Sequence, residues 1–93
     1  MIFVDALREH VRRGWLRQPI TGFWCHLATD GPLRELHDFA ASIGVPPRAF
    51  HAHPAHPHYD LDAERRAAAV AAGAIEVGSK ELVKRCFRRT RSV

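Results

Sequence analysis

The sequence predicts one small α/β domain with a three- or four-stranded, mostly parallel sheet flanked by helices. Short apolar runs rich in β-favouring residues alternate along the chain with segments of helical periodicity. Alternation of this kind is typical of a parallel sheet covered by helices. The chain has 93 residues, which is the length of one domain with one small core. We expect this domain to span residues 1–88 and a basic tail to follow at 89–93.

The first part of the chain predicts two strands with a helix between them. The apolar residues 2–4 predict a buried strand, and an aspartate cap followed by apolar positions on one face predicts a helix over 5–14. A loop is expected over 14–22 because it contains proline and glycine. A second strand is expected over 23–28. Strand alternation places Cys25 on the face opposite its histidine neighbour, so we expect a buried, unreactive thiol.

The rest of the chain alternates between helix and strand signals, with glycine after the first two of its three expected helices. The expected elements are a helix from the Thr29–Asp30 cap to about Ile43, a strand over 48–51, the loop HAHPAHPHYDL, a helix that Asp60 or Asp62 caps and Gly73 ends, a strand over 74–77, and a last helix from Ser79.

The positive charge is concentrated at the end of the chain. The formal net charge is +4, but residues 79–93 hold six lysines and arginines against one glutamate. A basic segment suits a nucleic-acid backbone or an acidic partner, and it is equally typical of a solvated helix end. No apolar run approaches the roughly 20 residues that cross a bilayer. Charged residues near the N-terminus, Asp5 and Arg8 among them, interrupt any signal peptide, so we expect a cytoplasmic protein.

Several motifs occur in an order and spacing that resemble a known family. They are FVD, WCHLATD, ELHDFAASIG, AF, PHYDL and RRAAAVAAGAIEV. The chain resembles the short bacterial and phage family called domain of unknown function 4031, up to about residue 84. The resemblance implies no particular activity. It implies that the family pattern includes Asp5, His26, Glu35, His37, His58, Tyr59, Asp60 and Arg66. The extra HAHPAH segment lies outside the pattern, so no shared role is expected for His51, His53 and His56.

Polar residues are expected to gather at one edge of the predicted sheet. Ligands of open α/β sheets bind beyond the carboxyl ends of the strands. Asp5 follows the first expected strand, His26 lies near the end of the second, and the HPHYD segment follows the third. The turn at Ser79 follows the fourth. The topology therefore predicts a site assembled from residues distant in sequence.

The first hypothesis for this site is a divalent metal centre holding zinc, nickel or manganese. His58 and Asp60 are two residues apart in an extended segment, so both can face one way. The further candidate ligands are His26 and His37, with Asp5 beside them. A metal-bound water would then hydrolyse a phosphate-containing or nucleotide-like substrate. The structural alternatives are solvent-exposed loop histidines, a helix cap at Asp60 and a buried, hydrogen-bonded histidine at position 37.

The second hypothesis uses the same pocket without a metal. His58 would act as general acid or base, and Asp5 or Asp60 would orient it. Tyr59 and Arg66 would bind the substrate, with the guanidinium holding an anionic group. A surface arginine paired with a neighbouring carboxylate is the structural alternative for position 66.

The alternative from another functional class is a non-catalytic module. It would bind nucleic acid or a protein partner through the basic C-terminal helix, which carries cations from Lys80 to Arg91. No recognised nucleic-acid-binding motif accompanies these charges. A domain this small can also complete a pocket by forming a homodimer, and the sequence leaves that open.

Overall fold

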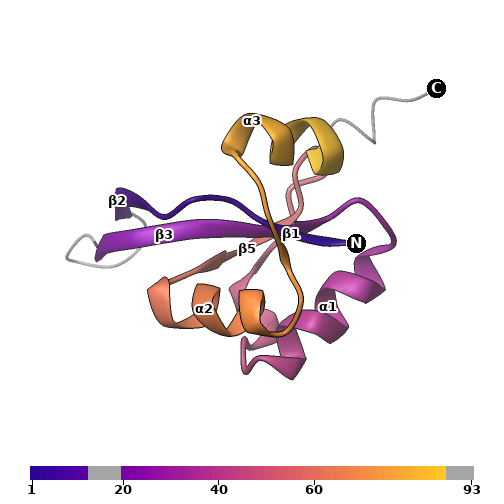
Figure 1. The fold of residues 1–93 in the computed structure, drawn as a ribbon, viewed down its shortest axis with the longest axis horizontal. Helices are drawn as coiled ribbons and strands as arrows, with labels where there is room; N and C mark the ends of the chain where they lie inside the picture. Colours follow the sequence, from indigo (N-terminus) through magenta and orange to yellow (C-terminus); the bar gives the residue numbers. More distant parts are fainter. Residues whose placement is uncertain (13–19, 88–93) are drawn as a thin grey trace.

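The computed structural model describes residues 1–12 and 20–87. In that part of the chain a six-stranded sheet has helices on both of its faces (Figure 1). The strands are β1 (Ile2–Val4), β2 (Arg8–Arg12), β3 (Ile20–Thr29), β4 (Phe50–His51), β5 (His58–Leu61) and β6 (Ile75–Glu76). The helices are α1 (Leu33–Ser42), α2 (Ala63–Ala71) and α3 (Ser79–Leu82), together with the 3-10 turn η1 (Pro47–Ala49) and the π-helical turn η2 (Val83–Phe87). The expected small α/β class is confirmed.

The expectation of a mostly parallel sheet is wrong. The strand order is β4-β5-β3-β1-β6, and β2 also pairs with β3. Every pairing is antiparallel except the one between β1 and β6. The long β3 forms the centre of the sheet, with β1 and β2 along part of its length and β5 along another part. Parallel pairing needs a crossover connection, and no helix connects β1 to β3.

The missing helix is the one expected over 5–14, where the chain forms β2 instead. The apolar positions in this segment are few, and pairing along β3 satisfies its backbone groups as a ladder. The expected loop over 14–22 lies partly outside the described residues, and its last residues belong to β3. The HPHYD segment was expected as a loop, but its last three residues lie in β5.

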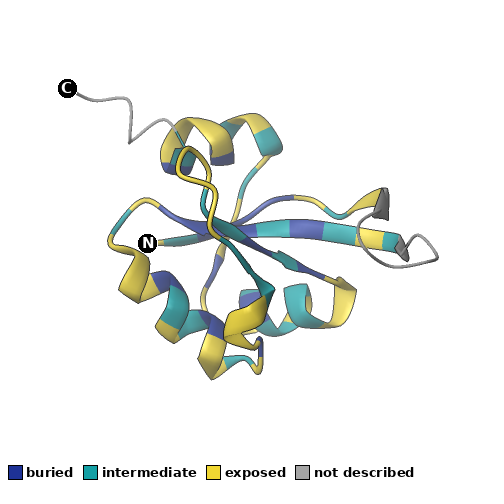
Figure 2. Ribbon diagram, turned by 180° about the vertical axis from the view of Figure 1, so that it is seen from behind, coloured by how far each residue is buried: buried dark blue, intermediate teal, exposed yellow. Residues whose placement is uncertain are grey.

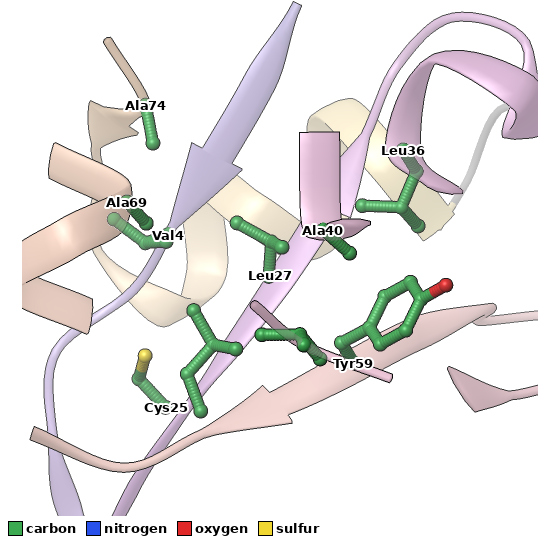
Figure 3. Packing of buried hydrophobic residues seen from close by; sticks show 10 residues of the cluster. Val4, Cys25, Leu27, Leu36, Ala40, Tyr59, Ala69 and Ala74 are labelled. Carbon is green, nitrogen blue, oxygen red and sulfur yellow. The ribbon is translucent and has the colours of Figure 1, made fainter. Parts of the chain in front are cut away.

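One face of the sheet packs on α1 and α2 and holds the larger core. Alternate strand residues supply Val4, Cys25, Leu27, Tyr59 and Leu61, all at most 2% exposed. The same cluster contains Leu36 and Ala40 of α1 and Ala69 of α2, and Figure 3 shows Leu27 and Tyr59 of the sheet among these helical side chains.

The other face of the sheet packs on α3 and η2 and holds a much smaller core. Phe3 and Ala28 of the sheet meet Leu82 and Cys86 of the helical segment there. Figure 2 shows the outer surfaces of all three helices exposed, while the buried positions lie along the strands and the inward faces of the helices. Because the α3 face buries few apolar side chains, it leaves room on the strands for polar ones.

The start of α2 does not use Asp60 as its cap. The N-cap of α2 is Asp62, whose Oδ1 accepts a hydrogen bond from the backbone N–H of Arg65 at 2.9 Å. Of the two caps that the sequence allowed, the structure therefore uses Asp62. Glycines follow two helices, as expected: Gly44 has φ of 81° and Gly73 has φ of 109°.

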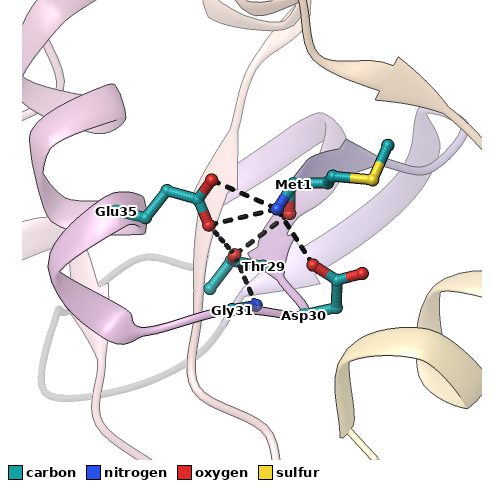
Figure 4. Close-up of polar contacts among 5 residues, drawn as sticks. All are labelled: Met1, Thr29, Asp30, Gly31 and Glu35. Atoms are coloured by element: carbon teal, nitrogen blue, oxygen red, sulfur yellow. Dashed lines mark hydrogen bonds and ion pairs between the residues drawn. The ribbon is translucent and has the colours of Figure 1, made fainter.

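A polar cluster fixes the entry to α1 (Figure 4). The amino group of Met1 lies 2.9 Å from Asp30 Oδ1 and 3.1 Å from Glu35 Oε1. The Thr29 hydroxyl lies 2.6 Å from the same Glu35 oxygen and accepts from the backbone N–H of Gly31 at 3.0 Å. Hydrogen bonding to Thr29 and the nearby ammonium hold the pKa of Glu35 below its usual value. The cluster thus joins the start of β1 to the start of α1.

Candidate metal centre

The side chains of the candidate site project from β3 and β5 on the α3 face of the sheet. On β5, Tyr59 and Leu61 point into the larger core, so His58 and Asp60 point the other way. Asp60 is paired in register with His26 of β3. Antiparallel pairing therefore places two imidazoles and one carboxylate on one small area of the sheet.

These three residues have the spacing of a metal site. One ligand atom from each of His26, His58 and Asp60 lies within 4.8 Å of the other two. Nε2 of His58 is 3.3 Å from Asp60 Oδ1, and the rings of His26 and His58 are 5.0 Å apart in an edge-on arrangement. Ligands that share a metal at about 2.1 Å lie about 3–3.5 Å from one another. Small side-chain rotations would bring all three atoms to that spacing.

The buried carboxylate of Asp5 orients His26. Asp5 is 2% exposed, and its Oδ2 lies 2.8 Å from Nδ1 of His26 while its Oδ1 accepts the His26 backbone N–H at 2.7 Å. Burial raises the pKa of Asp5, but the hydrogen bonds from His26 and from Ser79 outweigh burial and lower it. The hydrogen bond to Asp5 likewise raises the pKa of His26. A carboxylate that accepts from Nδ1 leaves Nε2 as the metal-binding nitrogen.

A break in the strand pairing puts the Asp5 side chain in this position. The pairing register with β3 advances by one residue between β1 and β2, so Ala6 and Leu7 together face Cys25. This is the geometry of a β-bulge, which turns side chains locally. Here the Asp5 carboxylate replaces its own main-chain carbonyl as the acceptor for His26. The freed carbonyl accepts from Nε of Arg66 at 2.8 Å.

The second imidazole is oriented in the same way by a main-chain group. Nδ1 of His58 lies 2.7 Å from the carbonyl oxygen of His56, so Nδ1 carries the proton and Nε2 faces Asp60. Metal-binding histidines nearly always donate their other ring N–H to a carboxylate or carbonyl. Both candidate ligands meet this condition. Two histidines and one carboxylate also form a ligand set that leaves coordination positions open for water or substrate.

A comparison with protein families matches residues 2–89 to the family described as "Protein of unknown function (DUF4031)". The chain belongs to this family. The expected resemblance to DUF4031 is therefore confirmed over nearly the whole chain. No curated protein and no solved structure matches it. Among the helices that the structure describes in this DUF4031 member, none is long and apolar enough to cross a membrane.

His51 also lies beside the triad, although no shared role was expected for it from the sequence. Its Nε2 is 3.2 Å from Asp60 Oδ2, and its ring stacks on His58 with centroids 4.8 Å apart. Pairing of β4 with β5 sets His51 opposite His58. The only sequence signal was the short strand expected over 48–51. His53 and His56 stack on each other at 3.7 Å in the exposed loop before β5.

Three of the candidate residues in this DUF4031 chain lie away from the triad. His37 and Tyr59 belong to the α1 face, where His37 Nδ1 lies 2.8 Å from the Tyr59 hydroxyl and its ring contacts Phe50 at 4.6 Å. Arg66 holds the Asp5 carbonyl and pairs with Glu76 at 3.1 Å. The structure thus gives these three side chains partners on other parts of the fold.

Cys25 has the environment of an unreactive thiol. It is 2% exposed, on the face opposite His26. Burial, together with the negative charge of Asp5, raises its pKa to about 12. The thiolate is therefore scarce at neutral pH, which agrees with the expected structural role.

Proposed function

We propose that this protein is a metal-dependent hydrolase that binds one divalent transition metal through His26, His58 and Asp60. The observation that supports it most is the orientation of the two imidazoles. Each has Nδ1 engaged by an acceptor, which leaves Nε2 for a metal, and Nε2 of His58 lies 3.3 Å from Asp60 Oδ1. Metal-binding histidines almost always have their other ring nitrogen held by such an acceptor, and here two of them lie beside a carboxylate. Zinc, nickel and manganese all accept this combination of ligands.

Each residue of the proposed site would have a separate role in holding the metal or in orienting its ligands. Nε2 of His26 and His58 and a carboxylate oxygen of Asp60 would hold the ion. Asp5 would keep the proton of His26 on Nδ1, and the carbonyl of His56 would do so for His58. The bound ion would supply a water of lowered pKa and a Lewis acid at the bond to be hydrolysed. The proposed substrate is a phosphate-containing or nucleotide-like molecule.

Elemental analysis of untagged protein tests the metal centre directly. Wild-type protein incubated with zinc, nickel or manganese and then desalted is expected to retain close to one equivalent of one metal. His26→Ala and the double variant His58→Ala/Asp60→Ala are expected to retain almost none. His53→Ala is the matched control, because it removes an exposed imidazole from the adjacent loop and should leave the metal content unchanged.

The outcome is decisive in both directions, provided that circular dichroism shows all variants folded. Retained metal that disappears only in the triad variants supports the centre. Absence of metal from wild-type protein with all three ions would overturn it. Equal metal in wild type and the triad variants would also overturn it, because the ion would then bind elsewhere. Hydrolysis is tested next, with phosphate esters and nucleotides as substrates for the metal-loaded protein.

A further inference from the structure

A hollow of about 480 Å³ lies beside α3, lined among the described residues by Ser79, Lys80, Val83 and Lys84. Its volume falls in the range of pockets that hold small molecules, which is about 300–1,000 Å³. We infer that this hollow binds the phosphate group of the substrate that the metal centre hydrolyses. The inference rests on the proposed function for the identity of that substrate, and three features of the hollow support it.

The first feature is the positive charge that lines the hollow. Lys80 and Lys84 are one turn apart and exposed, and neither has an ion-pair partner within residues 1–12 and 20–87. The neighbouring cation Arg85 is different, because it pairs with Glu81 and lies over the ring of Phe3 at 5.6 Å. The two lysines therefore keep their charge available for an anion.

The second feature is the connection between the hollow and the metal centre. Ser79 lines the hollow, and its hydroxyl donates to Asp5 Oδ2 at 3.3 Å. The same Asp5 oxygen lies 2.8 Å from His26 Nδ1. At the far end of the segment, the ring of Phe87 lies 6.1 Å from that of His58. The α3–η2 segment thus runs beside the candidate ligands, and the hollow lies along its first part, from Ser79 to Lys84.

The third feature is the chemistry of the lining. Lysine acts as a compact point charge with three donors and is a common ligand for phosphate. Val83 is 41% exposed and offers an apolar surface for the organic part of a phosphate ester. Arg66 was the residue expected to hold an anion, but it is engaged by the Asp5 carbonyl and Glu76. The lysine-lined hollow is therefore the better candidate for this role.

The test is a titration of metal-free protein with inorganic phosphate, followed by amide chemical shifts. Removing the metal first prevents phosphate from binding to the ion itself. Wild-type protein is expected to show saturable shifts at Ser79 and Lys80. Lys80→Gln/Lys84→Gln should weaken binding about tenfold, since it removes both charge-assisted contacts. Arg34→Gln/Arg48→Gln is the control, because it removes the same charge from exposed positions on α1 and η1.

Saturable binding that the lysine variant loses and the control keeps supports the inference. Equal binding in both double variants, or no saturable shift up to about 10 mM phosphate, would overturn it. Metal retention, measured on separate portions of the same preparations after incubation with zinc, separates the two proposals. Bound zinc without phosphate binding would leave the metal centre standing and the hollow without this role. Phosphate binding without metal would reject the hydrolase proposal and keep an anion site.

Discussion

Asp5→Asn isolates the part that the carboxylate beside His26 plays at the candidate metal centre. The substitution keeps the size and shape of the side chain but replaces one oxygen by an NH₂ group. The backbone N–H of His26 requires an acceptor, so Oδ1 of the new amide stays on it at the 2.7 Å contact. The NH₂ group then occupies the place of Oδ2, facing Nδ1 of His26 and the hydroxyl of Ser79. The hydroxyl can rotate to accept, but Nδ1 can accept only by giving up its proton.

The size of the effect follows from that change of tautomer. With Nδ1 as acceptor, the proton of His26 moves to Nε2 and blocks the lone pair that would bind the metal. Metal binding must then break the new hydrogen bond. The variant also lacks the carboxylate charge that made the imidazole more basic. Changing a residue that holds a metal-binding histidine in this way costs about 10–100-fold in metal affinity. We expect that loss for Asp5→Asn, which corresponds to about 1.4–2.7 kcal/mol of binding free energy.

The assay is competition for zinc against a chromophoric chelator, with thermal unfolding of the metal-free proteins measured in parallel. Nitrogen-15 spectra of the His26 ring report directly which nitrogen carries the proton, which a merely structural role for Asp5 would not change. Ser79→Ala is the control, because it removes only the longest of the three hydrogen bonds to Asp5 and should weaken zinc binding less than about threefold. The reasoning is refuted if Asp5→Asn binds zinc like wild type while His26→Ala does not bind it.

Four further predictions concern stability and reactivity. Tyr59→Phe removes the hydrogen bond to His37 and should lower the free energy of unfolding by about 1 kcal/mol, seen as a fall in Tm of about 4–8 °C, without changing metal content. Asp62→Ala removes the cap of α2 and should lower it by about 1 kcal/mol in denaturant titrations. Zinc at about 100 times its Kd should raise the free energy of unfolding of wild type by about 2.7 kcal/mol, and a chelator should reverse the gain. Cys25 should react with a thiol reagent only at the rate of unfolding, because it is buried and its pKa is about 12, and fast labelling of native protein would contradict this.

A strand with a clear local sequence pattern could be predicted from the sequence. A strand that forms only because it pairs with a distant segment could not. Residues 2–4 were expected as a strand and form β1, since a short apolar run before a polar residue is typical of a buried strand. Segment 5–14 carries a weak helical pattern, but β3 offers it a complete ladder of hydrogen bonds. Tertiary pairing overrides a weak local preference. That difference removed the expected crossover helix between β1 and β3, and these two strands pair antiparallel.

The candidate residues were named from the sequence, but where in the fold they lie was not predicted. Asp5, His26, His58 and Asp60 were all named from the sequence, and the structure brings them together. They meet on a sheet face through lateral pairing of β3 with β5, not at the carboxyl ends of parallel strands. Only residues far apart in sequence decide which strands are neighbours, so the spacing of motifs could not reveal this.

By itself the sequence determined the local chemistry of this protein. The alternation of His58, Tyr59, Asp60 and Leu61 requires two polar side chains on one face of a strand and two buried ones on the other, because the side-chain period of a strand is two. Only the tertiary structure decided what each face meets. Strand pairing places His26 opposite Asp60. On the other face of the sheet, His37 contacts the Tyr59 hydroxyl. Arg66 donates a hydrogen bond to the Asp5 carbonyl. The physical reason is that the pairing register and the bulge after β1 depend on backbone hydrogen bonds between separate segments of the chain, which local patterns do not specify.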